Sequence, residues 1–279
     1  MEVNKTSLDC ICASLCKIMG VEAPQKAAPS NDILTKYAKE IFSGKNADRI
    51  FVFNPDAIGE WVYEKYKHLM REVVDKTDVK IPLCSVMPSV TPVCFATMYT
   101  GTQPQVHGIQ SYTKPVLTIE TIFDALINAG KKCAIVSTAN DSISMIFLER
   151  QMDYYIYPTT EQVNAKAVEL IIKDEHDFIV VYNAKFDATM HKYGPESLEA
   201  LAELRSNAEQ FAMFNELIKE NWKNHNVLLG FATDHGCHEI DGRCGSHGLD
   251  MTEDLNIVHF YKAHLSCENP SVLEPTVAH

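Results

Sequence analysis

Short apolar runs alternate with amphipathic segments along most of the chain. The apolar runs, which are typical of buried strands, lie at 49–53, 79–86, 133–136, 178–182, 227–232 and 257–260. Between them, apolar residues recur with helical spacing at 8–19, 31–41, 57–75, 92–100, 118–129, 160–173 and 196–223. Apolar strands that alternate with helices predict an α/β protein whose largely parallel sheet is covered by helices on both faces.

No repeat, low-complexity segment or linker divides the chain. We therefore expect one domain over residues 1–279, a three-layer αβα sandwich with the N-terminal helices (about 1–45) packed outside the sheet. No apolar stretch approaches the roughly 20 residues that span a bilayer. Asp9 interrupts the first apolar run, and no small-residue cleavage site follows it, so neither a membrane segment nor a signal peptide is expected.

Composition narrows the classes of function. Hydrophobic residues make up 46% of the chain, which is enough for a large core. The formal net charge is −12 and no Lys/Arg run is present, so binding to a nucleic-acid polymer is not expected. A small anionic substrate held by a metal remains compatible with this charge. The nine cysteines, an odd number, indicate reduced thiols and favour a cytoplasmic location.

Acidic and imidazole side chains follow several of the predicted strands, at the edge of a parallel sheet where ligands bind. Each of them alone has an ordinary explanation as a turn, cap or helix-surface residue. Together, three carboxylates and three imidazoles suit a two-cation site for zinc or manganese. The set is Asp56, Asp187, His191, Asp234, His235 and His247.

Thr91 stands at the start of the predicted helix 92–100, immediately before Pro92. Proline suits the first helical position, so Thr91 is expected to be the N-cap, and capping alone would explain its hydroxyl. A helix N-terminus also attracts anions, and a Thr hydroxyl beside bound cations can attack phosphorus. With the Asp/His set nearby, we interpret Thr91 as a catalytic nucleophile and a metal contact.

The segments that carry these residues resemble a known family. The run 87–109, MPSVTPVCFATMYTGTQPQVHGI, resembles the nucleophile segment of the alkaline phosphatase superfamily, in its type I phosphodiesterase/nucleotide pyrophosphatase branch. The runs DATMHKYGP at 187–195, TDHG at 233–236 and SHG at 246–248 resemble the metal-binding elements of that branch. The motifs extend from about residue 50 to 260, which is most of the chain.

The resemblance implies an alkaline phosphatase-like fold and a metal-dependent hydrolase of phosphate esters. A phosphodiesterase or nucleotide pyrophosphatase acting on a small phosphate ester is the expected activity. Two divalent ions are implied, with zinc favoured and manganese possible. One ion would be held by Asp187, His191 and His247, and the other by Asp56, Asp234 and His235, with Thr91 beside it as nucleophile. His107 would be structural.

Substrate contacts are where the sequence departs from the family. We align Cys94 with an Asn whose amide holds a phosphoryl oxygen in nucleotide pyrophosphatases, and a thiol is a weaker donor. Lys185 and Arg243 are candidate substrate-binding cations, because they lie close in sequence to predicted ligands. Cys237 and Cys244 also flank the metal motifs, and we expect them to be structural thiols.

Other readings stay open at this point. Related enzymes with the same metal set include phosphomonoesterases, phosphonate hydrolases and phosphomutases. A sulfatase is disfavoured, because the segment CSVMP at 84–88 lacks the CxPxR pattern. A metal-binding homologue without catalysis is the alternative outside the enzymes. The sequence leaves the leaving group and the oligomeric state open.

Overall fold

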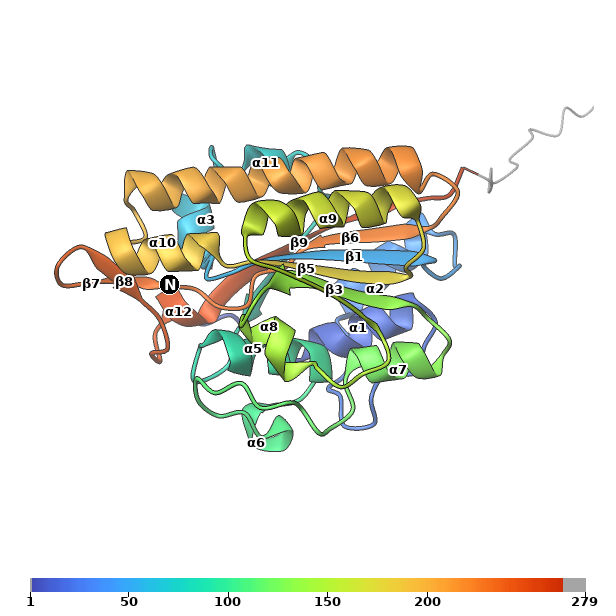
Figure 1. Ribbon diagram of the computed structural model, residues 1–279, viewed down its shortest axis with the longest axis horizontal. Coiled ribbons are helices and arrows are strands. Elements are labelled where there is room, and N and C mark those ends of the chain that lie inside the picture. Colours follow the sequence, from blue (N-terminus) through green and yellow to red (C-terminus); the bar gives the residue numbers. More distant parts are fainter. Residues whose placement is uncertain (1, 268–279) are drawn as a thin grey trace, which may run out of the picture.

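The computed structural model describes residues 2–267, and a seven-stranded sheet forms its centre (Figure 1). The strand order is β2-β9-β6-β1-β5-β3-β4. All neighbouring strands run parallel except β9, which is antiparallel to both β2 and β6. The mostly parallel sheet that the apolar runs predict is therefore confirmed. The strands are β1 (Arg49–Pro55), β2 (Val79–Cys84), β3 (Cys133–Thr138), β4 (Asp153–Tyr157), β5 (Phe178–Asn183), β6 (Val227–Phe231) and β9 (Asn256–His264).

Helices cover both faces of the sheet, which completes the three layers. In Figure 1, α9, α10 and α11 lie above the sheet, and α1, α2, α5, α7 and α8 lie below it. The helices are α1 (Cys10–Ile18), α2 (Asp32–Ile41), α3 (Glu60–Lys65), α4 (Arg71–Val74), α5 (Thr91–Thr100), α6 (Pro104–His107), α7 (Ile122–Asn128), α8 (Ser142–Ile146), α9 (Thr160–Lys173), α10 (Lys185–Tyr193), α11 (Leu198–Asn221) and α12 (Thr252–Leu255). Within residues 2–267, no helix combines the length and the apolar character needed to cross a bilayer.

Each face of the sheet has its own hydrophobic core. Ile50 and Val52 of β1 pack into the layer that contains α1, α2, α5 and α7. Phe51 and Phe53 of the same strand pack into the opposite layer, against α11. Successive strand residues point to opposite faces, so a strand that is buried on both sides needs an uninterrupted apolar run.

Several expected elements differ from the structure. The helix expected at 57–75 is two short helices, α3 and α4, joined by a turn. The helix expected at 118–129 begins only at Ile122, because Thr121 caps it in a capping box with Asp124. The edge strand β4, the helix α8 and the hairpin of β7 (His238–Ile240) and β8 (Cys244–Ser246) were not predicted. The last strand extends to His264, because β9 pairs with strands on both sides.

The sheet brings the carboxyl ends of β1, β5 and β6 together. Strand β1 lies between the other two, with Pro55 opposite Asn183 and Phe53 opposite Phe231. Chain segments that leave these three strands therefore start side by side at one edge of the sheet. This edge is where the candidate ligands gather.

Candidate metal centre and active site

The six predicted ligands form two adjacent clusters. In each cluster the potential ligand atoms lie within 4.8 Å of one another. The rings of His235 and His247 stack with centroids 4.1 Å apart, which places the two clusters next to each other. The deep cluster comprises Asp56, Asp234 and His235, and the outer cluster comprises Asp187, His191 and His247.

The deep cluster is built on the ends of β1 and β6. Asp56 directly follows β1, and Asp234 and His235 follow β6 by a few residues. The Nε2 atom of His235 lies 3.3 Å from Oδ1 of Asp56 and 3.4 Å from Oδ2 of Asp234. All three side chains are at most 2% exposed. The backbone N–H of Ala57 donates to the other oxygen of Asp234 at 3.2 Å, which fixes the orientation of that carboxylate.

The outer cluster is built on α10 and on the loop after β8. Asp187 and His191 are one helical turn apart, so they lie on the same face of α10. Oδ1 of Asp187 lies 3.3 Å from Nε2 of His191 and 3.4 Å from Nε2 of His247. The side chain of His191 is 42% exposed, so this cluster reaches the surface of the protein.

All three imidazoles are oriented in the same way. In each ring, Nδ1 lies within hydrogen-bond distance of a backbone carbonyl oxygen, which can only accept. A neutral ring therefore carries its proton on Nδ1 and directs the Nε2 lone pair into its cluster, as histidine metal ligands do. The pairs are His191 with Gly245 at 2.9 Å, His235 with Gly236 at 2.9 Å and His247 with Ser89 at 2.8 Å.

Three carboxylate oxygens in the clusters are buried without a hydrogen-bond partner in the described part of the chain: Oδ1 of Asp56, Oδ1 of Asp187 and Oδ2 of Asp234. Burying an unpaired carboxylate oxygen carries a large free-energy cost. Each of these oxygens faces an imidazole Nε2 of its own cluster. A divalent cation between them would pair both kinds of atom, so the donor set fits a metal in each cluster.

The pKa values of the carboxylates also favour cation binding. Burial raises the pKa of Asp234 to about 7. Burial, together with the charges of Asp234 and Asp187, also raises the pKa of Asp56 well above its usual value. Although burial acts to raise the pKa of Asp187, the neighbouring imidazoles of His191 and His247 outweigh it and hold that pKa well below the usual range. The deep cluster therefore holds carboxylates that resist ionisation until a positive charge neutralises them.

Thr91 faces the deep cluster. Its hydroxyl lies 3.4 Å from Oδ2 of Asp56, to which it donates, and 3.3 Å from Nε2 of His235. The prediction that Thr91 is the N-cap is wrong, because α5 starts at Thr91 itself and Val90 is the N-cap. Val90 is extended, and its carbonyl accepts hydrogen bonds from two amides of the first turn. Freed from capping, the Thr91 side chain points at the candidate ligands.

The three predicted substrate-binding residues have other surroundings. Cys94 is fully buried in α5, where its sulfur accepts a hydrogen bond from the Ser85 hydroxyl at 3.2 Å. Lys185 is two residues before Asp187 and therefore projects from a different side of α10, where it forms an ion pair with Glu161.

Arg243 is exposed in the turn between β7 and β8, and a Cβ at Gly194, which follows α10, would lie 3.0 Å from the Arg243 carbonyl oxygen. In the described chain, neither Lys185 nor Arg243 has a hydrogen bond or ion pair with either cluster. Neither cation therefore contacts the clusters directly, and a role in binding substrate stays a prediction.

His107 and the two flanking thiols have structural contacts. Nδ1 of His107 accepts from the Ile109 N–H at 3.2 Å, and its Nε2 lies 3.0 Å from the Thr97 hydroxyl. Burial lowers the pKa of His107 to about 4, so the ring is neutral. Burial raises the pKa of the Cys237 thiol well above its usual value, and Cys244 is only half-buried. Neither thiol belongs to a cluster of possible ligands among the described residues.

One tyrosine that contacts the site was not predicted from the sequence. The Tyr182 hydroxyl donates a short hydrogen bond to Oδ2 of Asp56. The position of Tyr182 at the end of a predicted strand was a usable signal, but only the strand register places it beside Asp56.

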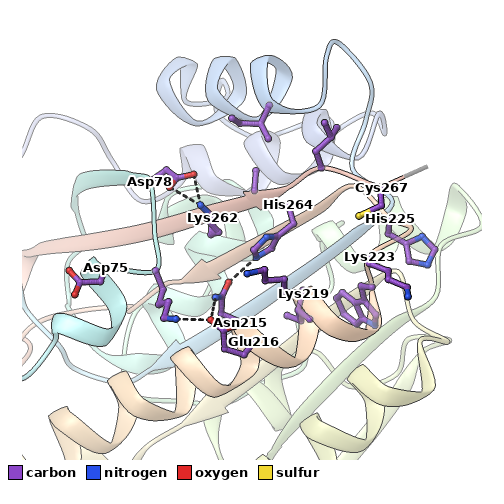
Figure 2. Close-up of a pocket in the computed structure, with 16 residues that line it drawn as sticks. Asp75, Asp78, Asn215, Glu216, Lys219, Lys223, His225, Lys262, His264 and Cys267 are labelled. Carbon is purple, nitrogen blue, oxygen red and sulfur yellow. Dashed lines mark hydrogen bonds and ion pairs between the residues drawn. The ribbon is translucent and has the colours of Figure 1, made fainter. Parts of the chain in front are cut away.

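A separate groove lies at the opposite edge of the sheet (Figure 2). Its volume is about 580 Å³, and it runs between α11 and the end of β9. Ion pairs already join its charged side chains, Lys76 with Glu216 at 2.7 Å and Lys262 with Asp78 at 2.9 Å. None of the candidate ligands lines it, so it is no part of the candidate active site.

Comparison with known proteins agrees with the geometry. A family model described as type I phosphodiesterase / nucleotide pyrophosphatase matches residues 53–125 and 131–265. These two stretches include all six candidate ligands and Thr91. No curated protein sequence shows significant similarity to the chain.

Solved structures share the fold at low sequence identity. Mouse ectonucleotide pyrophosphatase / phosphodiesterase 5 is 17% identical with a TM-score of 0.56, over 70% of this chain and 58% of that chain. The human protein of the same name is 13% identical with a TM-score of 0.58, over 77% and 87%. Phosphonoacetate hydrolase from Sinorhizobium meliloti, in complex with phosphonoformate, is 19% identical with a TM-score of 0.53, over 70% and 59%.

These likenesses confirm the expected alkaline phosphatase-like fold. The chain spans less than two thirds of the mouse and bacterial neighbours. An inactive threonine-to-alanine variant of the mouse protein has been solved in complex with AMP.

Proposed function

The chain belongs to the type I phosphodiesterase/nucleotide pyrophosphatase family, and from this premise we propose that it is a metal-dependent hydrolase of phosphate diesters that uses Thr91 as nucleophile. One observation carries the proposal. The Thr91 hydroxyl is not used to cap its helix and instead contacts Asp56 and His235, two potential ligands of a buried cluster. A hydroxyl with no structural task beside unpaired carboxylate oxygens is arranged for chemistry rather than for stability.

We propose that the deep cluster and the outer cluster each hold one divalent cation. Three protein ligands in each cluster leave positions open for substrate, as in catalytic zinc sites. Zinc is favoured because both clusters contain imidazole, and the carboxylates also suit manganese. When bound, the two cations stabilise the negative charge that develops on the attacking and leaving oxygens of phosphoryl transfer.

The side chain of Thr91 supplies the attacking oxygen. Its Oγ1 forms a bond to phosphorus while the bond from phosphorus to the leaving oxygen breaks, and water later hydrolyses the threonine ester. The hydroxyl proton points at Oδ2 of Asp56, which also accepts from Tyr182. The backbone N–H of Thr91 has no acceptor within residues 2–267 and lies at the start of α5, so it can donate to a phosphoryl oxygen.

The charges near Thr91 favour a diester. A phosphomonoester dianion needs a positive partner for its second charge, and 86–100 contains no Lys or Arg. Lys185, one of the two candidate cations, is paired with Glu161 instead. A singly charged diester needs no such partner. A phosphonate hydrolase is the second candidate, because phosphonoacetate hydrolase is among the structural neighbours.

A substrate panel tests the proposal. Chelated and reloaded protein, with zinc or manganese, is assayed on bis(4-nitrophenyl) phosphate, 4-nitrophenyl phosphate and phosphonoacetate. We expect the highest kcat/KM on the diester. A higher kcat/KM on the monoester overturns the diester preference, and one on phosphonoacetate favours the second candidate. If no substrate is turned over with either metal, the hydrolase proposal is overturned and the protein is a metal-binding homologue without catalysis.

A further inference from the structure

One buried carboxylate outside the two clusters connects the loops that carry their ligands. Asp254 of α12 is fully buried. Its Oδ1 lies 2.7 Å from Nδ1 of His238, and its Oδ2 accepts from the Leu249 N–H at 2.8 Å. Its backbone carbonyl accepts from the Gly236 N–H at 2.8 Å. A buried carboxylate with both oxygens paired forms a strong local constraint, since either partner left alone becomes a buried unsatisfied donor.

The three partners of Asp254 lie next to predicted ligands. Gly236 directly follows His235 of the deep cluster, and Leu249 is two residues after His247 of the outer cluster. The backbone of the segment also packs tightly here. A Cβ at Gly236 would lie 2.0 Å from the carbonyl oxygen of Glu253, so the two loops are in direct contact.

The two clusters depend differently on this connection. In the deep cluster, Asp56 directly follows β1, Asp234 follows β6 by a few residues, and the Gly236 bond uses only the backbone of Asp254. In the outer cluster, α10 holds two of the ligands, but His247 lies on a loop. Its other fixed points are strand β8, whose last residue Ser246 pairs with His238, the ring contact with Ser89, and the turn at Gly248, where φ is +105°.

We propose that Asp254 is a positioning residue of the metal centre, whose carboxylate holds the His247 loop in place for the outer cluster. Loss of the carboxylate should weaken cation binding in the outer cluster and spare the deep cluster. The inference rests on the proposed function, because it assumes that both clusters bind cations. Partners that orient metal ligands without touching the metal typically change metal affinity 10- to 100-fold, by an order-of-magnitude rule.

The test is titration of chelated protein with Co²⁺, followed by visible absorption and by competition with a chelator. We expect two binding steps in the wild type. In Asp254→Asn one step should weaken about 10- to 100-fold, while the other changes less than about twofold. The absorption band that weakens in Asp254→Asn should be the same band that is lost in His191→Ala, because His191→Ala removes a ligand of the outer cluster directly. Asp124→Asn, a capping carboxylate of α7 in the opposite helical layer, is the matched control and should keep both steps.

A second pair of variants covers the case in which Asp254→Asn does not fold. His238→Gln keeps an N–H that can donate to Asp254 and should retain both steps, whereas His238→Ala should weaken the outer step. Unchanged affinities in both Asp254→Asn and His238→Ala overturn the positioning role, and so does equal weakening of both steps in either variant. If the wild type binds no cation at all, the proposed function fails instead, and the two failures are thus distinguished.

Discussion

At the scale of single residues, the orientation of the Thr91 hydroxyl distinguishes a structural role from a catalytic one. The sequence predicts a capping hydroxyl or a nucleophile, and the two differ only in where the oxygen points. In the structure the oxygen makes no cap bond and contacts Asp56 and His235. Capping therefore does not account for Thr91.

Thr91→Ala should retain the fold and both metals but lower kcat on the best substrate by at least about three orders of magnitude, because a covalent nucleophile is lost. Rapid-mixing kinetics, metal analysis and circular dichroism measure this. Thr100→Ala, which removes a hydroxyl bonded to Ala96 in the same helix, is the control and should stay near wild-type rate. A third of the wild-type rate in Thr91→Ala contradicts the nucleophile assignment.

The surroundings of Cys94 determine what we expect when this residue is replaced by asparagine. The thiol is fully buried and accepts from Ser85, so a larger amide finds neither space nor a full set of partners there. Cys94→Asn should lower the free energy of unfolding by about 1–3 kcal/mol without raising turnover. Urea denaturation checks the first part, with Cys94→Ala as the comparison. A tenfold gain in kcat/KM would instead place the side chain at the substrate.

At the scale of elements, the apolar runs predicted most of the sheet and its largely parallel arrangement, but not the direction of its last strand. Strands such as β5 are uninterrupted apolar sequences, and that pattern requires cover on both faces. The antiparallel direction of β9 depends on its partners, which the sequence does not contain. The edge strand β4 (DYYIY) is partly exposed and lacks an apolar run, so nothing marked it.

The candidate ligands were predictable for a related reason. Residues that follow parallel strands meet at one edge, whatever the loops do afterwards. Side-chain direction was not predictable, because it depends on helical phase and loop geometry. Lys185 is close to Asp187 in sequence, yet α10 turns it toward Glu161. Asp254 lies outside every recognised motif, and only the three-dimensional structure connects it with Leu249.

The close contact between the loop after β6 and α12 predicts that a side chain at Gly236 destabilises the protein. Gly236→Ala places a methyl group 2.0 Å from the Glu253 carbonyl oxygen, which the backbone cannot avoid without moving. We expect a loss of roughly 2–4 kcal/mol in unfolding free energy and weaker metal binding in both clusters. Gly242→Ala, where a Cβ meets nothing within 4 Å, is the control and should cost about 1 kcal/mol through its positive φ alone. Equal melting temperatures for the two variants would contradict the close packing.

At the scale of the whole molecule, the clusters couple stability to pH when no metal is bound. Burial raises the pKa values of Asp56 and Asp234, the latter to about 7. A raised carboxyl pKa contributes stability that is present below the unfolded value and is lost as pH rises through the folded value. The lowered pKa of His235, about 3 through burial, acts in the opposite direction but only below its ordinary value of 6.5.

Metal-free protein should therefore lose stability between pH 6.5 and 8, on the order of 1 kcal/mol. Urea unfolding at the two pH values measures the loss, with and without added zinc. Zinc should reduce the loss, since the cation replaces the protons on the carboxylates. Asp234→Asn, which cannot ionise, should show a smaller loss than the wild type. A metal-free stability that is constant or rises over this interval contradicts the raised pKa values.

The unequal exposure of the two clusters has a consequence for the kinetics of metal exchange. His191 is 42% exposed, whereas His235 and Asp234 are inaccessible to solvent. With the proposed cations bound, a chelator would reach an ion in the outer cluster directly, but an ion in the deep cluster would depart only when the protein opens locally. Removal of metal should therefore occur in two phases, with a singly loaded protein accumulating between them. Reloading is limited in the same way, because an ion also enters the deep cluster only through local opening, so the rate at which this protein becomes fully loaded is set by its most enclosed ligands.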